Sequence, residues 1–199
     1  MVHPHDEGDT ARRPGHAAMA RPLAVLALLL LPVAAAGGEV TVAVDPAPHA
    51  CAVRGRFHVD LPPSAAWRVV TDYDHIPDFV HSMLSSRSER RPDGRRVVEQ
   101  TARGGFFLFK RRVHVVLELD EDPQRRIGFR DVLGKDFERY DGEWRLEPDS
   151  TGTSVRYSLD AEPRSSLPRS VCRHVLKGSA AELLTQVRDE MLRRAAMRP

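Results

Sequence analysis

The sequence lacks the patterns by which most enzyme active sites are recognised. It contains no GxSxG nucleophile elbow and no HExxH metal motif. The Gly104-Gly105 pair stands between expected strands without a phosphate-loop pattern, so it indicates a bulge or a hairpin break. The sequence therefore offers no catalytic residue, no metal ligand set and no cofactor motif.

An excess of charge of one sign is also missing. Lys and Arg number 30 and Asp and Glu number 28, which leaves a net charge of +2 and no strong field that would select a polyanion. Arginine pairs such as Arg90-Arg91 and Arg95-Arg96 stand near expected strand ends. Aromatic residues do not interleave with the basic residues as base-stacking surfaces require. Nucleic acid is therefore not an expected partner.

Long apolar runs are scarce, and the one at residues 23–31 is too short to cross a bilayer comfortably. Arg21 precedes it and Ala34-Ala35-Ala36 follows it, which is typical of a secretory signal peptide over residues 1–36. Residues 1–18 lie before a second methionine, Met19, and are interpreted as an over-extended start. We expect an exported, periplasmic bacterial protein. The alternative is that the run is retained as an N-terminal membrane tether.

Cysteine is scarce too, with Cys51 and Cys172 as the two cysteines of the chain. In an oxidising compartment they can pair, and the bridge would join the first strand of the domain to the last helix. Two separate buried thiols are the alternative, and the sequence leaves both open.

Alternating apolar and polar residues are present in most of the chain. After a lead-in at residues 37–49, the pattern predicts a strand, two short helices from Pro63 onwards, strands over residues 82–162 and a long helix from Arg169 to about Ala195. Strands joined by short turns pair antiparallel. We therefore expect an α+β domain at residues 50–196, in which a curved sheet and one helix enclose a cavity.

Several segments resemble the START-like (SRPBCC) superfamily. They are Pro62-Pro63 and Trp67, residues 71–80 (TDYDHIPDFV), 97–103 (VVEQTAR) and 109–113 (FKRRV), Gly142-Glu143-Trp144, and Gly152-Thr153 before Tyr157. The match is best to the polyketide cyclase/dehydrase group, which includes the coenzyme Q-binding START proteins. The resemblance implies a helix-grip fold, with about seven strands wrapped on a long C-terminal helix, and a hydrophobic ligand.

Apolar and aromatic side chains are expected to line the cavity, because pockets for apolar ligands use them with few polar groups. The inward face of each strand follows from period-two alternation, so one slip of register would invert it. The expected ligand-binding residues are Phe79, Val80, Met83, Phe107, Phe129, Trp144, Tyr157, Leu183 and Val187.

Asp72, Asp74 and Asp78 are the most conspicuous carboxylates. They could form a general base or a metal site at the cavity rim. Capping of two short helices explains all three without further assumption, so we favour it.

Three functional hypotheses follow. The first is binding or transport of a hydrophobic small molecule such as a lipid, an isoprenoid or a polyketide-like compound. The second is an enzyme of the cyclase/dehydrase or hydrolase type, with Asp74, His81 or Arg130 as acid–base or polarising groups. The third is a protein-interaction module whose groove takes a partner peptide. The lack of a catalytic constellation favours binding over catalysis, and the oligomeric state is not indicated.

Overall fold

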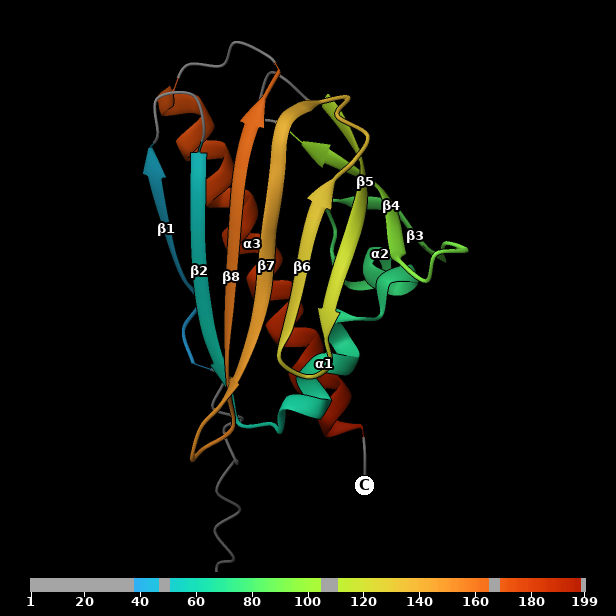
Figure 1. Ribbon diagram of the computed structural model, residues 1–199. Helices are drawn as coiled ribbons and strands as arrows, with labels where there is room; N and C mark the ends of the chain where they lie inside the picture. The colour runs from blue at the N-terminus through green and yellow to red at the C-terminus, as the bar shows by residue number, and fades with distance from the viewer. Residues whose placement is uncertain (1–37, 47–50, 105–110, 165–168, 198–199) are drawn as a thin grey trace, which may run out of the picture. The chain divides into compact units, whose positions relative to one another are not determined.

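The computed structural model describes residues 38–46, 51–104, 111–164 and 169–197 (Figure 1). A sheet, three short helical segments and one long helix make up this part of the chain, which confirms the predicted α+β class. In chain order the elements are β1 (Thr41–Pro46), β2 (Cys51–Val59), α1 (Pro63–Val70), the 3-10 turn η1 (Tyr73–His75), α2 (Ile76–Phe79), β3 (Met83–Arg90), β4 (Arg96–Gly104), β5 (Arg111–Asp122), β6 (Arg126–Asp131), β7 (Phe137–Pro148), β8 (Thr153–Pro163) and α3 (Arg169–Ala196).

The described strands form one antiparallel sheet in the order β1-β2-β8-β7-β6-β5-β4-β3. It has eight strands where about seven were predicted, because β1 pairs with β2 from Thr41 opposite Arg56 to Pro46 opposite Cys51. The lead-in over residues 37–49, where the alternation of Val40, Val42 and Val44 allowed a short edge strand, contributes this strand. The helix-grip architecture is confirmed, since α3 lies along one face of this sheet (Figure 1).

Period-two alternation decides which face of the sheet is buried. On β2 the buried positions are odd-numbered, and β8 repeats the pattern with Val155, Tyr157, Leu159 and Ala161. Both strands present these residues to α3, so sheet and helix share one hydrophobic core.

Gly55 lets α3 lie close to the sheet. A Cβ added at Gly55 would come within 2.2 Å of Cδ1 of Leu184, a helix residue that is fully buried. Any larger residue would therefore force the Leu184 side chain out of its present position.

The short helices close one end of the sheet–helix interface. Proline has no N–H to lose in a first turn, and α1 begins at Pro63 as predicted. The second of the two predicted short helices is divided between η1 and α2, and it ends at Phe79. Among the described residues, no helix has both the length and the hydropathy to span a bilayer.

Candidate functional site

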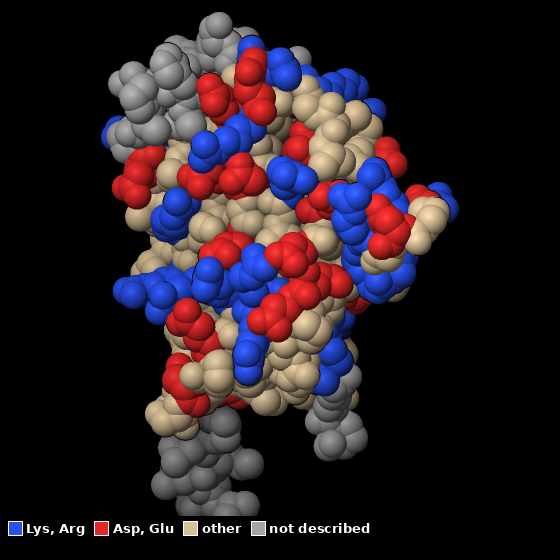
Figure 2. Space-filling model, viewed as in Figure 1, with Lys and Arg blue, Asp and Glu red and all other residues tan. Residues whose placement is uncertain are grey.

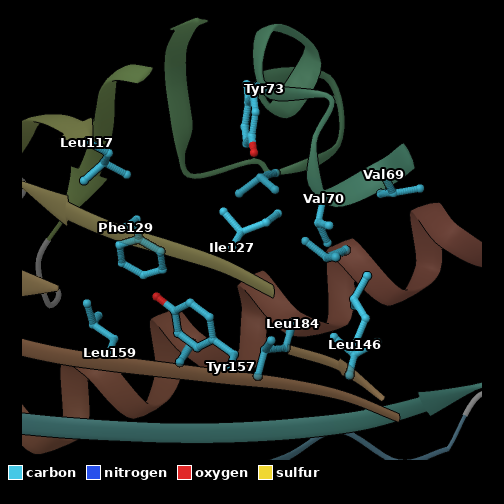
Figure 3. Packing of buried hydrophobic residues seen from close by; sticks show 14 of the residues in the cluster. Val69, Val70, Tyr73, Leu117, Ile127, Phe129, Leu146, Tyr157, Leu159 and Leu184 are labelled. Atoms are coloured by element: carbon cyan, nitrogen blue, oxygen red, sulfur yellow. The ribbon is translucent and has the colours of Figure 1, made fainter. Parts of the chain in front are cut away.

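A cavity of about 120 Å³ lies between the inner face of the sheet, α3 and the α1–η1–α2 segment. Figure 3 shows Ile127, Phe129 and Tyr157 extending from the sheet into this interior, with Tyr73 and Val70 on its other side. Aliphatic and aromatic side chains make up nearly the whole wall. The cavity is therefore suited to an apolar guest.

Eight of the nine predicted ligand-binding residues line this cavity, and they come from α2, the residues after it, four strands and α3. They are Phe79, Val80, Met83, Phe129, Trp144, Tyr157, Leu183 and Val187. The ninth, Phe107, lies outside the described residues. Contact of these side chains with a ligand stays a prediction.

Sequence reasoning did not select the polar members of the wall, which are Tyr73, Gln100 and Tyr140. Gln100 is two residues from buried Val98 on β4, so period-two alternation could have placed it inward. Tyr140 shares a face with Trp144 for the same reason. The further apolar members are Val69, Val70, Ile76, Val98, Leu117, Leu119 and Ile127.

Tyr140 and Tyr157 form a hydrogen-bonded pair of hydroxyls inside the core. Burial raises the pKa of Tyr140 to about 12 and raises that of Tyr157 well above its ordinary value. The rings of Trp144 and Tyr157 are 4.7 Å apart, and Phe129 stacks on Tyr157 at 6.2 Å. Both phenols therefore stay neutral at physiological pH and are held in place as hydrogen-bonding groups.

Gln100 and Tyr73 supply the other polar atoms of the wall. The amide nitrogen Nε2 of Gln100 donates to Oγ of Ser86 over 3.2 Å. The amide oxygen Oε1 of Gln100 has no partner among the described residues. The Tyr73 hydroxyl donates to Glu121 over 2.6 Å. Burial, and then this hydrogen bond, raise the pKa of Tyr73 above its usual range. Gln100 is thus the wall residue with a polar atom available to a guest.

The three carboxylates expected to cap the short helices do not do so. No side chain caps α1, η1 or α2. Asp72 instead accepts from His75 and pairs with Arg194 of α3 over 2.7 Å. Asp74 accepts from the backbone N–H and the hydroxyl of Ser88 on β3, at 2.6 and 2.9 Å. For Asp72 and Asp74, tertiary partners that are distant in sequence take the place of the local caps. Asp78 lies in the first turn of α2 without a side-chain cap bond.

The residues suggested for acid–base chemistry lie away from the cavity wall. Asp74 is bonded to Ser88, His81 is exposed and contacts Gln186 over 2.9 Å, and Arg130 pairs with Glu118 over 3.0 Å. No described carboxylate or histidine lines the cavity. In the part of the chain that the structure describes, no three His, Cys, Asp or Glu side chains are grouped as a metal site would require.

Comparison with known proteins agrees with this geometry. Residues 50–196 match the family described as polyketide cyclase/dehydrase and lipid transport. The chain belongs to this family. No curated protein sequence matches it significantly.

Solved structures of the START superfamily share the fold of this family member. The ZhuI aromatase/cyclase from a Streptomyces species has a TM-score of 0.63 at 19% identity, covering 74% of this chain and 96% of that one. A START superfamily protein from Mycobacterium smegmatis has a TM-score of 0.61 at 13% identity, and the match covers 73% of this chain and 98% of that one. A STAR-related lipid transfer protein from Xanthomonas axonopodis has a TM-score of 0.56 at 17% identity, and the match covers 77% of this chain and 98% of that one. At these identities the likeness concerns the fold alone.

In this family member an ionic cluster, formed by Asp72, Glu190, Arg193 and Arg194, joins the end of α3 to the short helices. Buried Glu190 accepts from both arginines at 2.6 Å, and the Arg194 guanidinium lies 5.6 Å from the Phe79 ring centroid. Burial works against the charged form of Asp72, but hydrogen bonds from His75 and Arg194 outweigh it and lower its pKa. The cluster thus fixes Phe79 at the cavity wall.

Proposed function

We propose that this protein binds a hydrophobic small molecule, of the lipid, isoprenoid or polyketide-like class, in the cavity between sheet and α3, and carries it outside the cytoplasm. The observation that carries the proposal is the chemical composition of the cavity wall. The wall is apolar apart from Gln100 and three tyrosine hydroxyls, one of which donates to Glu121. Burial of apolar area supplies about 25 cal/mol per Å², and one or two polar contacts suffice to orient such a guest.

The size of the cavity sets a condition on binding. At about 120 Å³ it has room for about four water molecules of about 30 Å³ each, whereas ligand pockets usually measure about 300–1,000 Å³. A lipid can therefore enter only if the cavity enlarges. The half-buried Met83 and Leu183 are wall residues that can move outward, while Val80 and Val98 are fixed in the core.

The polar groups also bear on the cyclase/dehydrase alternative. Such a reaction needs a group that moves a proton near neutral pH. The raised pKa values of Tyr140 and Tyr157 make both phenols poor bases there. Binding therefore explains the wall with fewer assumptions than catalysis does.

Uptake of a neutral apolar dye, N-phenylnaphthylamine, tests the proposal by fluorescence. Leu183→Trp at the wall should weaken dye binding by about tenfold or more, because overfilling a packed site costs about 1–3 kcal/mol. Leu192→Trp is the matched control, since Leu192 is a half-buried leucine of the same helix outside the wall. It should bind like the wild type.

Native mass spectrometry after exposure to a total lipid extract provides the second measurement. The wild type should retain an apolar molecule and Leu183→Trp should lose it. If the wild type takes up neither dye nor lipid, the binding proposal is rejected and the interaction-module hypothesis gains.

A further inference from the structure

The outer face of the sheet, opposite the cavity, carries a row of arginines. Arg56 on β2 lies directly opposite Arg156 on β8, Arg156 opposite Arg145 on β7, and Arg145 opposite Arg126 on β6. Like charges placed directly opposite each other on neighbouring strands destabilise a sheet. Carboxylates beside Arg126, Arg145 and Arg156 offset this repulsion, whereas Arg56 has no acidic partner among the described residues. We call the four residues the arginine row.

Beside the row lies an open hollow of about 730 Å³ over β1, β2, β8 and β7. Figure 2 shows a row of blue side chains on this face, bordered by red side chains and by an uncharged area. Small residues, Ala43 and Ser158, lie on that outer face, and both line the hollow. Its charged lining consists of four arginines and one glutamate, Arg54, Arg56, Arg145, Arg156 and Glu143.

The arginines of the hollow are exposed, and three of the four have an acidic partner. Arg145 pairs with Glu143 of the same hollow over 2.5 Å. Arg156 pairs with Glu147 over 3.0 Å while its side chain stays 60% exposed, and Arg54 pairs with Asp160 over a longer 3.4 Å. The guanidinium of Arg56 has the Thr41 hydroxyl, at 3.3 Å, as its one side-chain partner among the described residues. Exposed ion pairs hold their side chains weakly, so these guanidinium groups can turn towards an anion.

We propose that this hollow binds a phosphate group, either free or in a phospholipid head group. The planar fork of a guanidinium donates two parallel hydrogen bonds to phosphate oxygens, and arginines converging from adjacent strands multiply that match. The hydroxyls of Thr41 and Ser158 add neutral donors at the same place. The site lies on the face opposite the cavity, so it does not depend on the proposed function.

Titration with inorganic phosphate, followed by NMR of the arginine Nε–H groups, tests the site. The shifts should saturate in the wild type and shrink as NaCl screens the charges. Arg56→Gln/Arg156→Gln should weaken binding by about tenfold or more. The matched control, Arg87→Gln/Arg139→Gln, removes two exposed strand arginines outside the hollow and should bind as the wild type does.

Vesicle flotation distinguishes the two sources of phosphate. Binding to vesicles that contain phosphatidylglycerol, lost in Arg56→Gln/Arg156→Gln, identifies a lipid head group. Saturable binding of inorganic phosphate without flotation identifies a free phosphate. Either result supports the site. Absence of both, or an equal loss in the control variant, overturns it.

Discussion

At the scale of single residues, Gly142 determines how closely the aromatic side chains of the cavity approach β7. A Cβ there would lie 2.1 Å from the backbone oxygen of Ser158 and 2.7 Å from Cζ of Phe129. The first neighbour is backbone of the adjacent strand and cannot yield cheaply. Any side chain at this position would therefore disturb either the β7–β8 pairing or the position of Phe129 in the cavity wall.

Gly142→Ala should lower the free energy of unfolding by about 1–3 kcal/mol, because it forces atoms into occupied space. Gly178→Ala is the matched control, since a Cβ on Gly178 of α3 meets nothing within 4 Å. Alanine is the better helix former, so this variant should gain about 0.5–1 kcal/mol. Urea unfolding of both variants measures the difference, and equal effects would contradict the packing argument.

At the scale of elements, α3 combines an apolar stripe with a buried charge. Ala180, Leu184, Val187 and Met191 are buried against the sheet, and Glu190 is buried beside them. The hydrogen bond from Arg193, followed by that from Arg194, outweighs burial and lowers the pKa of Glu190 below the ordinary 4.5. The helix end is thus held by a carboxylate that folding keeps charged.

A lowered pKa contributes stability that is complete above the unfolded pKa of 4.5 and is lost as the pH falls through the folded value. Glu190→Gln should therefore cost about 1–2 kcal/mol at pH 7, a modest figure because Arg193 and Arg194 are partly exposed. The cost should shrink below pH 4.5. Glu182→Gln, at an exposed position of the same helix, should change little. A cost for Glu190→Gln that does not depend on pH would refute the ionic explanation; thermal unfolding across this range provides the measurement.

At the scale of the whole molecule, a covalent link adds to the packing of sheet and helix. Cys51 at the start of β2 is disulfide-bonded, and the chain's second cysteine is Cys172, whose side chain lies outside the described residues. A bridge between them would close a loop of well over half the chain. Loops of this length give the largest entropic stabilisation, about 5 kcal/mol in the chain-entropy account.

The intact mass of protein isolated from the periplasm of an expressing bacterium tests export and pairing together. We expect a chain that begins at Gly37 and is two hydrogen atoms lighter than its reduced form. Titration of thiols after unfolding without reductant should find none. A first residue before position 23 would overturn the predicted cleavage, and two free thiols would overturn the bridge.

Much of the fold could be predicted because its signals are local. Strand alternation gave the inward faces of β7 and β8, Pro63 marked the start of α1, and apolar spacing gave the span of α3. Eight predicted wall residues followed from the same periodicities. The contacts of Asp72 and Asp74 escaped prediction because they join segments that are distant in the sequence. The pairing of Asp72 with Arg194 requires the end of α3 to reach η1.

The arginine row shows the same limit more sharply. Arg56, Arg145 and Arg156 belong to three strands, and they align because register sets them side by side. Neither the net charge nor a search for runs of basic residues detects such an arrangement. The pairing of Glu190 is different, because Arg193 and Arg194 follow it by three and four residues on α3, a spacing that the sequence itself shows.

The contact between Asp74 and Ser88 has a consequence for how this protein behaves at high concentration. β3 is an edge strand, and its unpaired backbone groups offer a template for strands of other molecules. Asp74 occupies one of these donors, the N–H of Ser88, and places a negative charge beside it. At the opposite edge, β1 ends at Pro46, which has no N–H to offer. Each open edge of the sheet thereby has one position that cannot donate a hydrogen bond to a strand of another molecule, which works against the intermolecular pairing that leads to aggregates.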